Sequence, residues 1–226
     1  MPKPIKKRIE KKTTPEEGLK GTVEDLKVRL KQRQRILVYS LIIFSALTVA
    51  VVSFVLYNKA TANRASDLEL EGYRLFHGDY ATQSVSPEDR YKKALKMFQD
   101  SYEKKKKPHV LLYIAYCYYE LGKYDESIKT LKELNNQFSD PQIISLSYYK
   151  MAMTYVKKGD MENALNSLKN LSSIKNSPLQ DVALMESGKI LDHIGKKEEA
   201  KSKYKELINN FPKSALANEA KVRLGE

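Results

Sequence analysis

The chain has 226 residues, with 40 Lys or Arg against 28 Asp or Glu, so its formal net charge is +12. Its one cysteine, Cys117, excludes an intramolecular disulfide and any metal site built from several cysteines. Three scattered histidines add little material for a metal centre. Composition therefore argues against a secreted disulfide scaffold and a zinc protein, and we expect no metal and no cofactor.

The first 35 residues form a basic head, with twelve Lys or Arg and five Asp or Glu. Residues 1–21 are rich in proline and glycine and poor in large apolar residues, which predicts disorder. Thr22-Val-Glu-Asp25 is similar to a capping box and predicts a helix over residues 22–57. The head suits a topology determinant that rests on anionic lipid. A docking arm or a nucleic-acid tail is the alternative, and we expect no nucleic-acid partner.

A stretch of 22 residues, 36–57, contains no Asp, Glu, Lys or Arg. As a helix it would be about 33 Å long, against a hydrocarbon core of about 30 Å. Ile36 begins the stretch, and Tyr39 and Tyr57 lie near its ends, where aromatic rings favour the membrane interface. We therefore predict a membrane span over residues 36–57.

The alternatives to this anchor are a buried core helix and a cleavable signal peptide. Ala60-Thr61-Ala62 has the shape of a cleavage site, but the apolar run and the head before it are both longer than in signal peptides. Residues 16–35 carry six Lys or Arg and residues 58–77 carry three. Because the more basic flank stays cytoplasmic, we expect a cytoplasmic amino terminus and a carboxy-terminal domain outside, in the periplasm of a bacterium.

The rest of the chain repeats with a nearly constant period. Gly122, Gly159 and Gly195 are separated by 37 and 36 residues. A small residue stands seven positions before each glycine, and a large one four before and nine after. The small residues are Ala115, Ala152 and Gly188, and the later large ones are Leu131, Leu168 and Tyr204. This pattern predicts helical hairpins that the glycines close in a left-handed conformation, so we expect an all-α fold.

The expected first helices cover residues 111–121, 146–156 and 182–194, and the second helices cover 124–137, 161–171 and 197–210. The segments 121–127, 158–164 and 194–200 resemble the hairpin centre of tetratricopeptide (TPR) repeats. The resemblance covers residues 108–225 and implies three TPR repeats followed by a cap helix. The expected architecture is thus an amino-terminal transmembrane helix followed by an α-solenoid.

The pattern weakens upstream, where Gly78-Asp-Tyr80, Ala94 and Phe98 resemble parts of a further repeat. We expect a divergent first hairpin over residues 60–105, with an inserted surface loop at 81–89. The lysines at 104–107 suit a helix end in solvent or, as the alternative, a site for an acidic partner.

No phosphate loop, strand pattern or metal-ligand pair is present in the sequence, and Cys117 fits a buried position better than a nucleophile. We therefore expect no enzyme and no small-molecule substrate. With each small residue taken as facing the second helix, the neighbouring face of the first helices should line a concave protein-binding surface. Its predicted members are Leu112, Tyr116, Tyr119, Tyr149, Met153, Met185 and Lys189.

An amino-terminal anchor with an outer TPR domain resembles the translocon-associated TPR proteins of the bacterial inner membrane. That resemblance implies translocon subunits, client chains or periplasmic chaperones as partners. The alternative is an envelope scaffold that connects an inner-membrane complex to cell-wall or secretion machinery. A receptor at an organelle surface is a third reading, which the basic head fits poorly.

Overall fold

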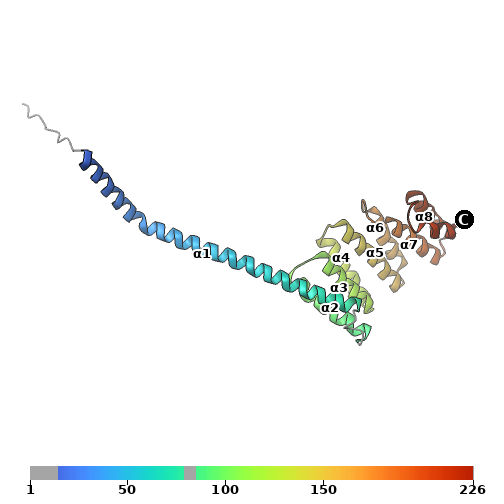
Figure 1. The fold of residues 1–226 in the computed structure, drawn as a ribbon. Coiled ribbons are helices and arrows are strands. Elements are labelled where there is room, and N and C mark those ends of the chain that lie inside the picture. The colour runs from blue at the N-terminus through green and yellow to red at the C-terminus, as the bar shows by residue number, and fades with distance from the viewer. Residues whose placement is uncertain (1–14, 79–84, 226) are drawn as a thin grey trace, which may run out of the picture. The chain divides into compact units, whose positions relative to one another are not determined.

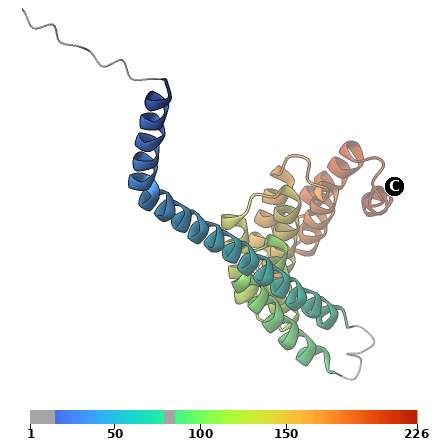
Figure 2. The same ribbon diagram turned by 60° about the vertical axis from the view of Figure 1, so that its left-hand side comes forward.

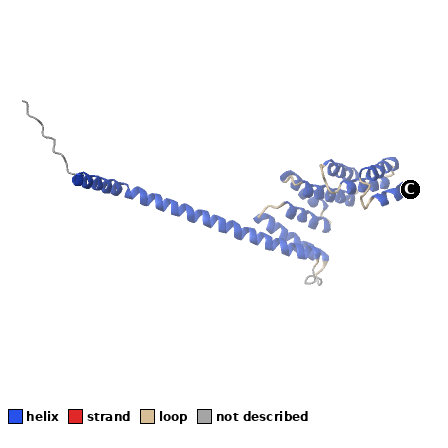
Figure 3. Cartoon of the chain, turned by 45° about the horizontal axis from the view of Figure 1, so that its top comes forward, coloured by secondary structure: helices blue, strands red, loops and turns tan. Residues whose placement is uncertain are grey.

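The structure, a computed structural model, describes residues 15–78 and 85–225, and within these it is helical without strands (Figure 3). The all-α class predicted from the sequence is confirmed. The helices in chain order are α1 (Pro15–His77), α2 (Pro87–Lys104), α3 (Pro108–Glu120), α4 (Tyr124–Gln137), α5 (Pro141–Lys158), α6 (Met161–Ser173), α7 (Gln180–His193), α8 (Lys197–Asn210) and α9 (Ala217–Leu224) (Figure 1). The chain divides into two units, residues 1–58 and 59–226.

The first unit consists of the earlier part of α1. This helix begins at Pro15, seven residues before the expected start at Thr22, because proline is well suited to the first turn of a helix. Residues 15–21 are therefore helical, while residues 1–14 of the expected disordered head lie outside the described residues. The apolar segment is exposed along its whole length, with Ile36 at 67% and Tyr57 at 71%. Among the described helices, α1 is the one long and apolar enough to cross a membrane.

The second unit is a series of helical hairpins. The last part of α1 lies beside α2, and then α3 pairs with α4, α5 with α6 and α7 with α8 (Figures 1 and 2). Helix α9 packs against α8 and closes the series. Within the expected loop at 81–89, residues 81–84 are not described, and residues 87–89 form the first turn of α2 instead. Ser86 caps that turn, since its Oγ accepts the N–H of Asp89 at 3.1 Å.

The three repeating glycines serve the turns through their backbone conformation. Gly122, Gly159 and Gly195 have φ between +71° and +82°, and a Cβ on any of them would meet nothing within 4 Å. The residue after each glycine donates its N–H to a carbonyl at the end of the first helix, at 2.9 Å in all three hairpins. These bonds join Lys123 to Tyr118, Asp160 to Tyr155 and Lys196 to Leu191. Glycine is thus required for the left-handed turn that ends each first helix.

The two helices of a hairpin approach each other where a small residue faces a large one. Ala115, Ala152 and Gly188 are buried on the first helices, and Leu131, Leu168 and Tyr204 are buried on the second helices. A Cβ on Gly188 would lie 2.3 Å from Cε1 of Tyr204. The α7–α8 hairpin therefore combines glycine with an aromatic ring, whereas the α3–α4 and α5–α6 hairpins have alanine and leucine at these positions.

The first hairpin follows the same packing rule although its sequence diverges. Gly72 is buried on α1, and a Cβ there would lie 2.8 Å from Cε1 of the fully buried Phe98. Ala94 lies one turn before Phe98 and is also fully buried. Gly72 is the small residue of this hairpin, and the sequence pattern alone did not reveal it.

A partly buried carboxylate joins α1 to the start of α3. Glu69 Oε2 accepts from Nζ of Lys107 at 2.7 Å, and Oε1 accepts from Nε2 of His109 at 2.7 Å and from the hydroxyl of Tyr73 at 3.1 Å. The Glu69 side chain is only 13% exposed. Burial opposes its charged form, but the hydrogen bonds from Lys107 and His109 outweigh that effect and hold the pKa of Glu69 below its usual value.

This contact predicts a pH-dependent stability difference. Glu69→Gln should lower the free energy of unfolding by about 1–3 kcal/mol at neutral pH, because Lys107 and His109 lose a charged acceptor. The pKa of Glu69 is lower in the folded chain than in the unfolded chain, so its stabilisation is complete at neutral pH. It is lost as the pH falls through the folded-state pKa, and the difference between the variant and the wild type should close in acid.

The measurement is thermal unfolding of the full chain in detergent, followed by circular dichroism from neutral to acidic pH. Glu71→Gln, two residues further along α1 at an exposed position, should leave the melting temperature nearly unchanged. A constant difference between Glu69→Gln and the wild type at every pH would contradict the role of the charge.

The close contact in the α7–α8 hairpin gives a second prediction. Gly188→Ala should destabilise the folded chain by about 1–3 kcal/mol because the new Cβ collides with Tyr204, partly offset by the better helix propensity of alanine. In a double-mutant cycle of thermal unfolding, adding Tyr204→Leu should recover part of that loss. Lys205→Ala, at the exposed neighbouring position, serves as the control. Strict additivity of the Gly188 and Tyr204 changes would show that the two positions do not limit each other.

Candidate protein-binding surface

One face of the first helices carries partly buried aromatic and charged side chains. We define the first-helix face by Tyr116 and Tyr119 on α3, Tyr149, Lys150 and Met153 on α5, and Glu186 and Lys189 on α7. All seven are neither fully buried nor fully exposed. Five of them were predicted from the sequence as surface residues, whereas Lys150 and Glu186 were not.

Leu112 and Met185, which were also predicted for this surface, lie inside the core. Leu112 is 3% exposed and Met185 is completely buried. Met185 belongs to a cluster that includes Tyr204 and Ala220, so the cap helix α9 helps to cover it. Both residues precede the small residue of their hairpin by three positions, as Tyr149 does in the α5–α6 hairpin, but the half-buried tyrosine is larger and reaches the surface.

Lys150 joins the tyrosines of α3 to α5. Its Nζ lies 3.4 Å from the ring centroid of Tyr119 and 4.8 Å from that of Tyr116, which are cation–π contacts. Glu120 Oε1 is 3.7 Å from the same nitrogen. Burial lowers the pKa of Lys150, while the nearby Glu120 opposes that shift. The arrangement fixes a cation between two aromatic rings on this surface.

The tyrosines of the first-helix face keep their hydroxyl protons at neutral pH. Burial raises the pKa of Tyr116 to about 12 and also raises the pKa of Tyr119 and Tyr149. A protonated phenol can donate one hydrogen bond and accept others, while its ring offers apolar contact. The surface can therefore contact both the side chains and the backbone carbonyls of a bound segment.

A hollow of about 220 Å³ lies between α5 and α7 at the far end of this face. Met153 and Lys189, both predicted, line it together with the unpredicted Glu186. Lys189 Nζ lies 3.2 Å from Glu186 and 3.3 Å from Glu219 of α9, so the cap helix contributes a charge here. Methionine adapts its shape to different apolar groups, which suits a hollow that accepts varied side chains.

The comparisons with known proteins agree with this hairpin geometry. The profile of the tetratricopeptide repeat-like domain family matches residues 30–225, which is most of the chain. The protein belongs to this family. A search of curated proteins finds no match.

Solved structures with the same fold share little sequence with the chain. A tetratricopeptide repeat protein from Parabacteroides merdae has a TM-score of 0.54 at 17% identity, over 72% of this chain and 59% of that one. A putative kinesin light chain with nearly identical TPR-like repeats from Podospora anserina has a TM-score of 0.54 at 13% identity, over 73% and 84% of the two chains. The MamA protein has a TM-score of 0.51 at 15% identity, over 72% and 88%. At these identities the similarity shows the fold alone.

The first hairpin extends the aromatic side of this TPR domain beyond the predicted residues. Phe76 of α1 lies 5.3 Å from the ring of Tyr113 and 6.5 Å from that of Tyr116. His77 Nε2 lies 3.4 Å from the hydroxyl of Tyr113. Phe76 was not predicted because the repeat period is not kept in the first hairpin, although Phe76 lies only two residues before Gly78, which resembles part of a repeat.

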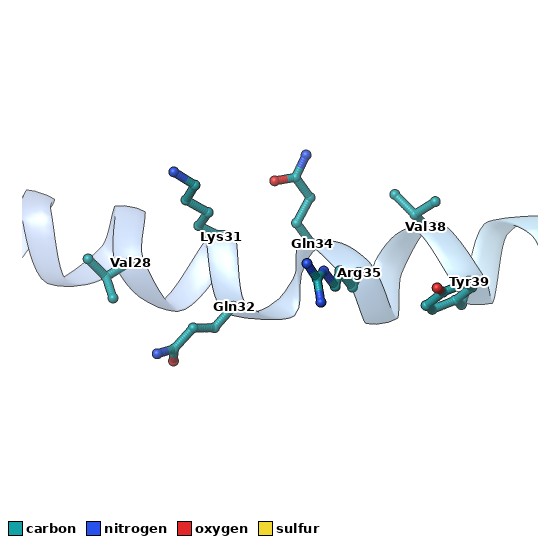
Figure 4. Close-up of a pocket in the computed structure, with 7 residues that line it drawn as sticks. All are labelled: Val28, Lys31, Gln32, Gln34, Arg35, Val38 and Tyr39. Carbon is teal, nitrogen blue, oxygen red and sulfur yellow. The ribbon is translucent and has the colours of Figure 1, made fainter.

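Residues between Val28 and Tyr39 project from one helix, and no second segment of the described chain encloses them (Figure 4).

Cys117 is fully buried, and burial raises the pKa of its thiol to about 12, which leaves it protonated and unreactive at neutral pH. In the described part of the chain, no group of three or more potential ligand side chains could hold a metal ion.

Proposed function

We propose that this TPR protein is anchored in a membrane by residues 36–57 and uses its first-helix face to hold segments of other proteins. The repeats make the domain a protein–protein interaction module, and the exposed apolar stretch of α1 gives it a means of anchorage. The observation that carries the proposal is the joined row of Tyr116, Tyr119 and Lys150, which offers rings, hydroxyl donors and a fixed cation together.

The location follows from charge and length. The apolar segment is long enough to span a bilayer, and the flank before it holds more Lys and Arg than the flank after it. We place the amino terminus in the cytoplasm and the TPR domain in the periplasm, at the inner membrane. In that position the domain would meet chains as they leave the translocon, so translocon subunits, client chains and periplasmic chaperones are its proposed partners.

The second candidate function is an envelope scaffold, and the charged end of the same surface favours it. Lys189, Glu186 and Glu219 form a fixed ion-pair group that would suit a folded partner of complementary charge better than a series of unrelated client chains. Chemical crosslinking in intact membranes separates the two candidates. Adducts with translocon subunits and nascent chains support the first candidate, whereas adducts with cell-wall or secretion proteins support the scaffold.

Two substitutions test the binding surface directly. Tyr116→Ala combined with Tyr149→Ala should reduce partner crosslinking at least about fivefold, because the loss of even one well-packed anchor residue costs more than about 1 kcal/mol of binding. The measurement is the yield of crosslinked partner per molecule of the full chain in membranes. Circular dichroism of the purified chain should show unchanged helical content.

Two matched variants complete this test. Tyr116→Phe combined with Tyr149→Phe keeps both rings and should keep most of the binding if apolar contact dominates. Asn166→Ala combined with Lys169→Ala changes exposed positions on a second helix and should leave crosslinking unchanged. Normal crosslinking by a folded Tyr116→Ala, Tyr149→Ala chain would place the partner surface elsewhere and refute the proposal.

A further inference from the structure

The first hairpin brings the carboxyl end of α2 beside the position where the chain enters the second unit. At one end of the hairpin, Nη1 of Arg90 donates to the carbonyl of Leu75 at 3.2 Å. At the other end, Oγ of Ser101 donates to the carbonyl of Ala65 at 2.8 Å, and both groups are buried. The two helices are therefore antiparallel, as Figure 2 also shows, and α2 ends near the first residues of the unit.

A group of exposed basic side chains occupies this end of the hairpin. We define the lysine patch as Lys104, Lys105 and Lys106, which lie three to five residues after Ser101, together with Lys59 and Arg64 at the start of the unit. All five are exposed. Within residues 59–67 and 101–107, the exposed acidic residues are Asp67 and Glu103. The patch therefore has an excess of positive charge.

The next lysine along the chain does not share this exposure. Nζ of Lys107 donates to the partly buried carboxylate of Glu69 at 2.7 Å, and His109 shares that carboxylate. Glu69 is thereby occupied and cannot neutralise the patch. The same contact fixes the junction of α2 and α3 on α1, so Lys104, Lys105 and Lys106 stand on an anchored segment.

The length of the chain keeps this patch close to the apolar segment of α1. Tyr57 ends that segment, and Ala65, beside Ser101, follows eight residues later. Eight residues span at most about 29 Å even when fully extended. The patch must therefore remain within a few nanometres of any membrane that residues 36–57 cross, whichever way the domain turns.

We propose that the lysine patch binds the phosphate groups of anionic lipids in the membrane that α1 spans. This inference rests on the membrane anchorage proposed above. Lysines held near a negatively charged bilayer are attracted to it, and the attraction falls off within a Debye length. The contact would hold the TPR domain at the lipid surface and restrict the directions that its first-helix face can take.

The test uses the full chain reconstituted in vesicles, either of phosphatidylcholine alone or with added phosphatidylglycerol. A membrane-impermeant amine reagent labels exposed lysines briefly, and mass spectrometry measures the rate at each one. Lys104, Lys105 and Lys106 should react about fivefold more slowly on anionic vesicles, the change expected when each lysine contacts the charged surface. High salt should remove the difference, and Lys197 and Lys205 of α8, which are also exposed, should react equally on both vesicles.

A charge-removal variant gives an independent readout. In Lys104→Gln, Lys105→Gln, the protection of the remaining Lys106 on anionic vesicles should be lost, because the domain is no longer held at the surface. The matched control Lys129→Gln, Lys132→Gln removes two exposed lysines of α4 and should keep that protection. Protection of Lys106 that persists in the first variant would overturn the proposal.

Flotation separates the failure of this inference from the failure of the anchorage. A chain that does not float with neutral vesicles at high salt lacks the anchor, and both proposals fall. A chain that floats but shows equal labelling on the two vesicles keeps its anchor and refutes the lipid contact. Protection that arises only when an acidic protein is added would assign the patch to a protein partner instead.

Discussion

The approach of the two helices in each hairpin, small residue against large residue, is the constraint on which this domain depends. Glycine faces an aromatic ring in the first and last hairpins, at Gly72 with Phe98 and Gly188 with Tyr204. Alanine and leucine occupy the same positions in the two middle hairpins. Core packing tolerates little change in volume. Within each hairpin, a smaller residue on the first helix is therefore compensated by a larger residue on the second helix. This fixed spacing sets which face of every first helix remains uncovered.

The uncovered face gains its chemistry from the neighbours that packing leaves in contact. Lys150 lies over Tyr119 and Tyr116 because α5 is placed one hairpin after α3, and burial there lowers the lysine pKa. The same spacing sets Lys189 between Glu186 and Glu219. Apolar rings therefore occupy one end of the first-helix face and paired charges the other. A partner that matches both ends would bind in one direction along the helices.

The sequence predicts a local conformation well where that conformation favours one residue type. It predicts the exposure and contacts of a side chain poorly where these depend on residues of other helices. Gly122 predicts a left-handed turn because other residues adopt that conformation at a cost, and the structure has it at φ +71°. Met185 was misplaced because its exposure depends on α9, which lies more than thirty residues away along the chain. Lys150 was missed because its contact with Tyr119 joins two hairpins, and the repeat period aligns equivalent positions without showing which side chains meet between them.

Site-specific photocrosslinking in intact membranes is the most direct measurement of the central claim, that partners bind on the first-helix face. A photoreactive residue placed at Met153 of α5, or at Asn166 of α6 on the paired second helix, compares two faces of one hairpin. We expect discrete protein adducts from position 153 and none above background from position 166. Adducts from position 166 without adducts from position 153 would contradict the claim.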